Sequence, residues 1–317
     1  MGDEIYYDDL LEKSPAEDEY IWSEEFPVRV KAGFNLIRLM NHRRQENTLN
    51  SYARLLKALT DFGPDHDIMY SACEWGKTQP QNWAYKVCDS WRILNDITFR
   101  VGSDGDPGHA DWTSDYTTSV MSQYNKAVIM DEFSGIDKGW NDPDMLMIGM
   151  DGLGLAQNRT HMAMWCMMNA PLMLGLDLRR VEKGDELYRI IANRDLISIN
   201  QDSLGIQAKR IWTSLPHENA GNEYIRDNDR VDILCKPLSD SRFALSFINC
   251  SDHDADDVFS VSVSDIQKYL RDMIDSAGSY TVKDVWTGEE RENTDGVFSV
   301  RVLRAFDNAT FIISPKK

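Results

Sequence analysis

The sequence predicts an α/β domain followed by an antiparallel β-sandwich, with a boundary near residue 205 that separates residues 1–205 from residues 206–317. In the first part, apolar runs with strand character alternate with amphipathic segments of helical period, which predicts a parallel sheet. In the second part, spaced apolar runs are separated by turn signals, as in a small sandwich. The strands are expected at 35–40, 67–73, 172–176, 231–235, 243–248, 280–285, 297–302 and 310–314, and helices at 52–59 and 186–194.

Composition bounds the kinds of partner that the protein can have. The chain of 317 residues is 42% hydrophobic and carries a formal net charge of −18. This charge repels phosphate backbones and anionic lipid, so neither nucleic acid nor a membrane surface is an expected partner. The longest apolar stretch, residues 162–176, is interrupted by Asn169 and Pro171. It is shorter than the roughly 20 apolar residues of a membrane span, and we expect it in the core.

The N-terminal residues and the cysteines bear on location and cofactors. The acidic residues 1–18 show no basic start followed by an apolar segment, so no signal peptide is expected and a cytoplasmic location is predicted. The five cysteines are an odd number without the spacing of a zinc site, which predicts reduced thiols and no metal. A glycine-rich phosphate loop is not recognisable, and we expect no cofactor.

Three clusters of acidic and aromatic residues follow predicted strands in the first part of the chain. Residues 70–76 end in Glu74 and Trp75, residues 88–99 contain Arg92 and Asp96, and residues 139–146 contain Asp144 next to Met145. In a (β/α) barrel, the loops that follow the strands converge on one mouth. Acids that are far apart in the sequence are therefore expected to share a pocket.

Carboxylates, an arginine and indole rings at one mouth are the groups that bind a sugar. Aromatic faces stack on the apolar side of a pyranose, and charged groups bind its hydroxyls. Cleavage of a glycosidic bond needs two carboxyl groups, one of which donates a proton to the leaving oxygen. Asp96 is the candidate proton donor.

Each of these residues also has a simpler interpretation. Asp96 can be a helix cap or a surface partner of Arg92, and Glu74 can be a solvated strand end. Asp144 belongs to the turn sequence Asn-Asp-Pro-Asp, and Trp75 can pack in the core. His161, one turn before a tryptophan, is expected to be a core histidine rather than a metal ligand.

Five blocks in order resemble the α-galactosidase (melibiase) family, glycoside hydrolase family 27. They are YSACEWG at 70–76, DSWRILNDI at 89–97, GWNDPDML at 139–146, NAPLMLGLDLR at 169–179 and INQDSLG at 199–205. The resemblance implies a TIM-type (β/α)₈ barrel followed by a β-sandwich, and retaining hydrolysis of terminal α-galactosides. It implies Asp96 as the acid/base and a substrate-binding set made of Glu74, Trp75, Arg92, Asp144 and Met145.

The sequence departs from the family pattern where the nucleophile is expected. Residues 32–42 match the strand that carries the nucleophilic aspartate, which places Arg38 in the position of a substrate-binding lysine and Met40 in the position of the nucleophile. A thioether cannot form the glycosyl-enzyme ester. The first domain is also shorter than the roughly 250 residues of a complete barrel, so we expect the barrel to lack its N-terminal strands.

Three interpretations are compatible with these departures. The protein can be a hydrolase whose nucleophile comes from a second polypeptide or from Asp8 or Asp9. It can be a non-catalytic relative that binds α-galactosides, or a truncated, inactive homologue. An open barrel edge is expected to be covered by another copy of the chain or by a complementing chain. Glu74 followed by Trp75 favours galactose over N-acetylgalactosamine.

Overall fold

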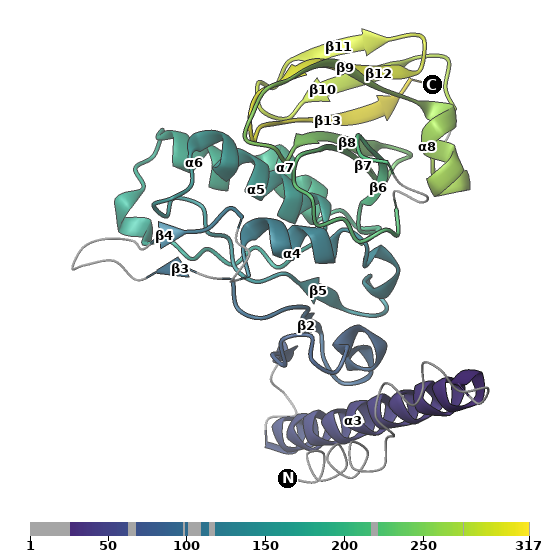
Figure 1. Ribbon diagram of the computed structural model, residues 1–317. Coiled ribbons are helices and arrows are strands. Elements are labelled where there is room, and N and C mark those ends of the chain that lie inside the picture. The colour runs from purple at the N-terminus through teal and green to yellow at the C-terminus, as the bar shows by residue number, and fades with distance from the viewer. Residues whose placement is uncertain are drawn as a thin grey trace.

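The computed structural model describes residues 26–62, 68–97, 99–100, 109–113, 118–216, 221–274 and 276–316. The side chains of residues 26–42, 62, 99–100 and 272 lie outside this description. Asp8 and Asp9 also lie outside it. The elements are arranged in three levels, with a long helix at one end, a mixed α/β part in the middle and the C-terminal sheets at the other end (Figure 1).

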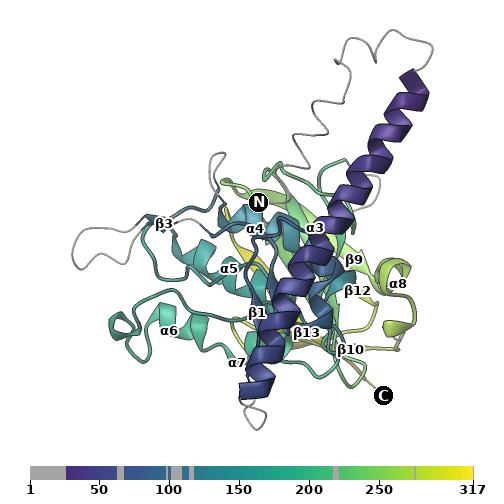
Figure 2. The ribbon, with the colours of Figure 1, turned by 90° about the horizontal axis from the view of Figure 1, so that it is seen from below.

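The first described element is the long helix α3 (Phe26–Phe62), which extends past the rest of the molecule (Figures 1 and 2). The helix predicted at 52–59 is confirmed, and the strand predicted at 35–40 is wrong, because these residues continue the same helix. A helix satisfies its backbone hydrogen bonds internally, whereas a strand needs a neighbouring strand. One face of α3 packs against the core through Leu49, Tyr52, Leu56 and Leu59, at the 3- and 4-residue spacing of a helix face.

A parallel sheet of three short strands follows. Its order is β1 (Ser71–Ala72), β2 (Ser90–Arg92) and β5 (Trp140–Asp142), with Ser71 paired to Ser90 and Trp91 to Asn141. The segment predicted as a strand at 172–176 forms only a parallel bridge, between Leu146 and Leu174. The strand predicted at 67–73 is reduced to β1 within the described residues.

Helices and a small hairpin surround this sheet. The helix predicted at 186–194 is confirmed over residues 186–191, and Asn193 caps the next helix, which begins at Arg194, by accepting a hydrogen bond from the Leu196 N–H. The hairpin is β3 (Phe99–Arg100) with β4 (His109–Ala110), and the helices are α4 (Val120–Ala127), α5 (Leu155–Met167), α6 (Glu186–Ile191) and α7 (Arg194–Asn200). Short 3₁₀ turns lie at Pro80–Asn82, Ala84–Lys86, Asp131–Phe133, Leu178–Arg180 and Arg271–Met273.

The C-terminal part is antiparallel, as predicted. A six-stranded sheet has the order β11-β10-β13-β8-β7-β6, and β9 pairs with β12. The five predicted strands are confirmed, but β6, β9, β11 and helix α8 were not predicted. The bounds are β6 (Lys209–Thr213), β7 (Val231–Pro237), β8 (Phe243–Asn249), β9 (Ala255–Ser262), α8 (Val263–Leu270), β10 (Tyr280–Asp284), β11 (Glu290–Asn293), β12 (Val297–Leu303) and β13 (Asn308–Pro315).

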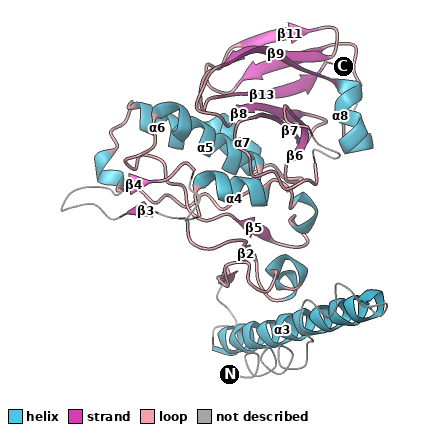
Figure 3. Ribbon diagram, in the orientation of Figure 1, coloured by secondary structure: helices cyan, strands magenta, loops and turns pink. Residues whose placement is uncertain are grey.

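The six-stranded sheet is buried on both faces over β7 and β8. One face packs against the β9–β12 ribbon through residues such as Phe243, Phe247 and Phe298. The other face packs against the α/β part, where Leu234 and Ile248 join the core that includes helix α5 (Figure 3). Because one core crosses residue 205, the domain boundary there stays a prediction. None of the helices that the structure describes is both long and apolar enough to cross a membrane.

Candidate active site

The parallel sheet brings the three predicted clusters to one edge. Glu74 follows β1, Arg92 is the last residue of β2, and Asp142 is the last residue of β5. In the register of the sheet, Arg92 lies opposite Asp142. The carboxyl ends of parallel strands form the edge where barrel proteins bind ligands.

Arg92 is the centre of this group of residues. Its Nη2 atom lies 2.5 Å from Oδ2 of Asp144 and 3.2 Å from Oδ1 of Asp96. The side chains of Arg92 and Asp144 are 9% and 13% exposed, whereas that of Asp96 is 67% exposed. One guanidinium thus joins a buried carboxylate to an accessible one.

The conformation of Asp144 is fixed by several hydrogen bonds. Its φ angle is 76°, in the left-handed region, and its N–H donates to Oδ1 of Asp142 at 2.8 Å. Oδ1 of Asp144 accepts from the N–H of Met145, and Oδ2 accepts from the N–H of Ile97, each at 2.8 Å. The turn interpretation of Asp144 is therefore confirmed, and the same turn directs its carboxylate toward Arg92. Burial raises the pKa of the neighbouring Asp142.

Glu74 is not a freely solvated strand end. Its Oε2 accepts hydrogen bonds from the N–H and the hydroxyl of Thr78, at 2.8 and 2.6 Å. Its Oε1 is buried and has no partner among the described residues. Desolvation by burial raises the pKa of Glu74.

Trp75 presents an accessible ring beside this carboxylate. The residue is 40% exposed with φ of 60°, so it does not pack in the core. The ammonium group of Lys77 lies 4.9 Å from the ring centroid. An exposed indole thus lies next in sequence to a half-buried carboxylate.

For Asp96, the structure shows the ion pair with Arg92 that the simpler interpretation requires. This contact does not exclude the role of proton donor, because the carboxyl group stays mostly exposed. The catalytic role of Asp96 and the substrate-binding roles of Glu74, Trp75, Arg92, Asp144 and Met145 stay predictions.

Arg38 and Met40 both lie within helix α3 and not at the end of a strand. Assigning them to the lysine and nucleophile positions depended on the strand at 35–40. Their side chains lie outside the description, so both assignments stay predictions.

Two residues near the site were not predicted to belong to it. Thr78 holds Glu74, and Trp165 on α5 donates its indole N–H to the main-chain oxygen of Asp144 at 2.8 Å. Thr78 lies only four residues after Glu74, so the local sequence could have indicated it. The contact of Trp165 spans 21 residues in the chain, and only the tertiary structure shows it.

His161 is a buried core residue, as expected, but its buried Nδ1 has no hydrogen-bond partner among the described residues. Its Nε2 accepts a hydrogen bond from the N–H of Met147 at 3.0 Å, and burial lowers its pKa to about 3. All five cysteines are free. Over the described part of the chain, no group of three or more His, Cys, Asp or Glu side chains is arranged to hold a metal ion.

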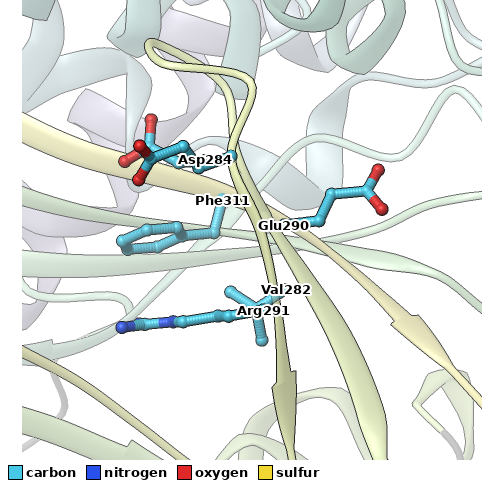
Figure 4. Close-up of a pocket in the computed structure, with 6 residues that line it drawn as sticks. Val282, Asp284, Glu290, Arg291 and Phe311 are labelled. Carbon is cyan, nitrogen blue, oxygen red and sulfur yellow. The ribbon is translucent and has the colours of Figure 1, made fainter.

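A hollow of about 120 Å³ lies on the C-terminal sheet, and none of the residues that line it belongs to the group of residues around Arg92 (Figure 4). Arg291 lies over Phe311, with 5.6 Å between the guanidinium carbon and the ring centroid. Asp284 caps the next turn by accepting from the N–H groups of Trp286 and Thr287. In Figure 4, Glu290 points away from Phe311. These groups have structural roles, and we assign no ligand to this hollow.

Comparison with known proteins identifies relatives of both parts of the chain. Residues 33–202 match the family model described as α-galactosidase A, and residues 228–305 match the α-galactosidase C-terminal β-sandwich domain. α-Galactosidase 3 of Arabidopsis thaliana is 30% identical over 269 residues, which cover 84% of this chain and 52% of the relative. α-Galactosidase A of Cellvibrio japonicus is 29% identical over 265 residues, covering 81% of this chain and 57% of the relative.

Solved structures agree with this result. The crystal structure of α-galactosidase I from Mortierella vinacea matches with a TM-score of 0.68 and 25% identity, over 86% of this chain and 64% of that one. The chain spans about half the length of the two relatives from Arabidopsis and Cellvibrio. The parallel strands are those of a TIM-type barrel, followed by the β-sandwich. Since the first family model alone matches more than half of its residues, the chain belongs to the α-galactosidase (melibiase) family.

Proposed function

We propose that this chain provides the acid/base and the sugar-binding wall of a retaining α-galactosidase. The observation that supports this proposal most is the contact of Arg92 with the carboxylates of Asp96 and Asp144, at the same edge of the parallel sheet at which Glu74 follows the adjacent strand β1. The relatives named α-galactosidase agree with it. The substrate class is a terminal α-linked galactoside.

Each side chain has a part in this reaction. The free Oε1 of Glu74 accepts a bond from a sugar hydroxyl, Arg92 and Asp144 bind further hydroxyls, and the ring of Trp75 packs against the apolar side of the pyranose. Asp96 donates its proton to the leaving oxygen and later accepts one from the attacking water. Its exposure leaves it accessible to both.

The nucleophile comes from outside the described residues in this proposal. A retaining mechanism needs a second carboxylate about 5–5.5 Å from the acid/base. A second polypeptide, another copy of the chain, or Asp8 or Asp9 supplies it. Apolar side chains lie exposed beside the edge strand β1, with Ile68 at 46% and Met69 at 68% exposure. A polypeptide that covers this edge would bury them.

The test is hydrolysis of a nitrophenyl α-galactoside by the purified protein together with any chain that copurifies with it. We expect turnover that depends on Asp96, with a larger loss for Asp96→Asn on melibiose than on the nitrophenyl substrate. The reason is that a sugar leaving group needs protonation and nitrophenolate hardly does. The β-linked nitrophenyl galactoside is the control substrate and should not be hydrolysed.

The possible results separate the three interpretations of the sequence. Galactose binding without turnover would identify a non-catalytic, sugar-binding relative and overturn the hydrolase. Absence of both turnover and galactose binding in a cooperatively unfolding protein would overturn the carbohydrate site itself. Equal losses for Asp96→Asn on both substrates would remove the role of Asp96 as proton donor.

A further inference from the structure

Two side chains of helix α5 form hydrogen bonds with the main chain of residues 144–147, in the loop that follows β5. The indole Nε1 of Trp165 donates to the main-chain oxygen of Asp144 at 2.8 Å, and Nε2 of His161 accepts from the N–H of Met147 at 3.0 Å. Both side chains are fully buried. Two residues one helical turn apart therefore hold the two ends of the segment 144–147.

The first of these contacts acts on a strained residue. Asp144 has φ of 76°, a region that costs a residue with a Cβ atom about 1 kcal/mol or more. Such a conformation persists only where surrounding contacts hold it. The indole N–H satisfies the carbonyl of the same residue, so it stabilises the strained conformation directly.

The direction of the Asp144 carboxylate depends on that main-chain conformation. Its Oδ2 reaches both Nη2 of Arg92 and the N–H of Ile97, at 2.5 and 2.8 Å. If φ of residue 144 left the left-handed region, Cβ would move relative to the preceding chain, and this oxygen could not keep both partners. The sugar-binding pair would then lose its arrangement without any change in either of its residues.

We propose that Trp165 is a positioning residue for sugar binding, which holds Asp144 in the conformation that directs its carboxylate to Arg92. The binding test of this inference rests on the proposed function, because it uses galactose as the ligand. Nothing in it requires Trp165 to touch the substrate.

The orientation of the indole is itself fixed by His161. The two rings meet edge to face, with centroids 4.1 Å apart and planes at 83°. Because His161 is fully buried, it stays neutral and its Nε2 can accept the Met147 N–H. The histidine thus holds the far end of the loop and packs against the tryptophan that holds the near end.

The decisive variant is Trp165→Phe, which keeps an aromatic ring in the core and removes the N–H donor. We expect the dissociation constant for galactose, measured by titration calorimetry, to rise about tenfold, as for the loss of one hydrogen bond. The matched control is Trp286→Phe, which removes an indole bond of 2.9 Å to Asn308 in the C-terminal part. The control should leave galactose affinity unchanged.

A double variant distinguishes positioning from a general loss of stability. In Asp144→Asn, the sugar-binding carboxylate is already lost, so adding Trp165→Phe should change the galactose dissociation constant less than about twofold. If the two substitutions raise the galactose dissociation constant independently, so that their factors multiply in the double variant, the inference is overturned. So would unchanged galactose affinity in Trp165→Phe.

A crystal structure of Trp165→Phe gives a readout that does not need a sugar. We expect residue 144 to leave the left-handed region and its carboxylate to move away from Arg92. If this happens in a protein that never binds galactose, the proposed function fails and the positioning role stands. If the loop is unchanged, the positioning role fails whatever the protein binds.

Discussion

Arg92 and Asp144, which are 52 residues apart in the chain, form a nearly buried ion pair with 2.5 Å between Nη2 and Oδ2. The pair lies where the second and third strands of the parallel sheet end. The same Nη2 atom of Arg92 also contacts the accessible carboxylate of Asp96.

Replacement of the buried partner should destabilise the protein. In Asp144→Asn, the guanidinium of Arg92 loses its shortest ion pair and keeps the exposed Asp96 and the neighbouring charge of Asp142. We therefore expect the free energy of unfolding to fall by about 2–3 kcal/mol. Urea unfolding at pH 7 measures this change. Asp195→Asn, which breaks the more exposed pair with Lys283, is the control and should cost much less. Equal losses of unfolding free energy in the two variants would show that the pair with Arg92 stabilises the protein no more than the exposed pair does.

Glu74→Gln should weaken galactose binding more than it affects folding. The amide keeps an oxygen that can accept from Thr78, but the charged acceptor at Oε1 is lost, and the dissociation constant should rise about tenfold. Titration calorimetry with galactose measures the effect. The control is Glu289→Gln in the hollow of the C-terminal sheet. If the control weakens galactose binding and Glu74→Gln does not, the sugar binds in that hollow.

His161 should make the protein sensitive to acid. Burial lowers its pKa from the ordinary value of 6.5 to about 3 in the folded state, so between these values the unfolded chain binds a proton that the folded chain does not. Stability therefore falls as the pH decreases from about 6.5 toward 3, by up to a few kcal/mol. Urea unfolding at about pH 7 and pH 4.5 measures the loss for the protein and for His161→Gln.

The glutamine variant keeps an acceptor for the Met147 N–H and does not titrate. It should therefore lose less stability on acidification than the unmodified protein. Equal losses in the two proteins would mean that other groups cause the acid sensitivity. A larger loss in the variant would contradict the sign of the pKa shift.

Asp232 is expected to be essential for the packing of the C-terminal sheet on the α/β part. It lies buried beside Arg230 and Arg210, and its Oδ2 accepts a hydrogen bond from the hydroxyl group of Tyr124 at 2.9 Å. Asp232→Asn removes the buried negative charge that faces the guanidinium groups of Arg230 and Arg210, and we expect a loss of about 3–5 kcal/mol in the free energy of unfolding. The measurement is urea unfolding, with Asp61→Asn in an exposed pair on α3 as control. A loss as small as that of the control would contradict the prediction.

Apolar runs in the sequence were sufficient to locate the central strands of the C-terminal sheet, because β7 and β8 are buried on both faces. β11 has the sequence EREN and lies at the sheet edge, mostly exposed, so it has no apolar signal to detect. The segment at 35–40 is apolar enough for either a strand or a helix. A strand at 35–40 would need a neighbouring strand to pair with, and in the structure these residues form part of helix α3.

The sequence predicted which residues form the candidate site better than it predicted the contacts that position them. Motif spacing identified Arg92, Asp96 and Asp144, and the sheet brings the three together. The support from Trp165 could not be predicted, because a tryptophan in an apolar helix has the same pattern whether its N–H is directed at a loop carbonyl or elsewhere. Local sequence shows which residues can do chemistry, and long-range packing decides how they are held.

The most direct test of the site is a crystal structure of the protein with galactose bound. We expect the anomeric oxygen within about 3.2 Å of an Asp96 oxygen, and hydroxyls bonded to Glu74, Arg92 and Asp144. Galactose bound at any other place on the protein, with the Asp96 carboxylate facing only solvent, would contradict the assignment of Asp96 as the proton donor.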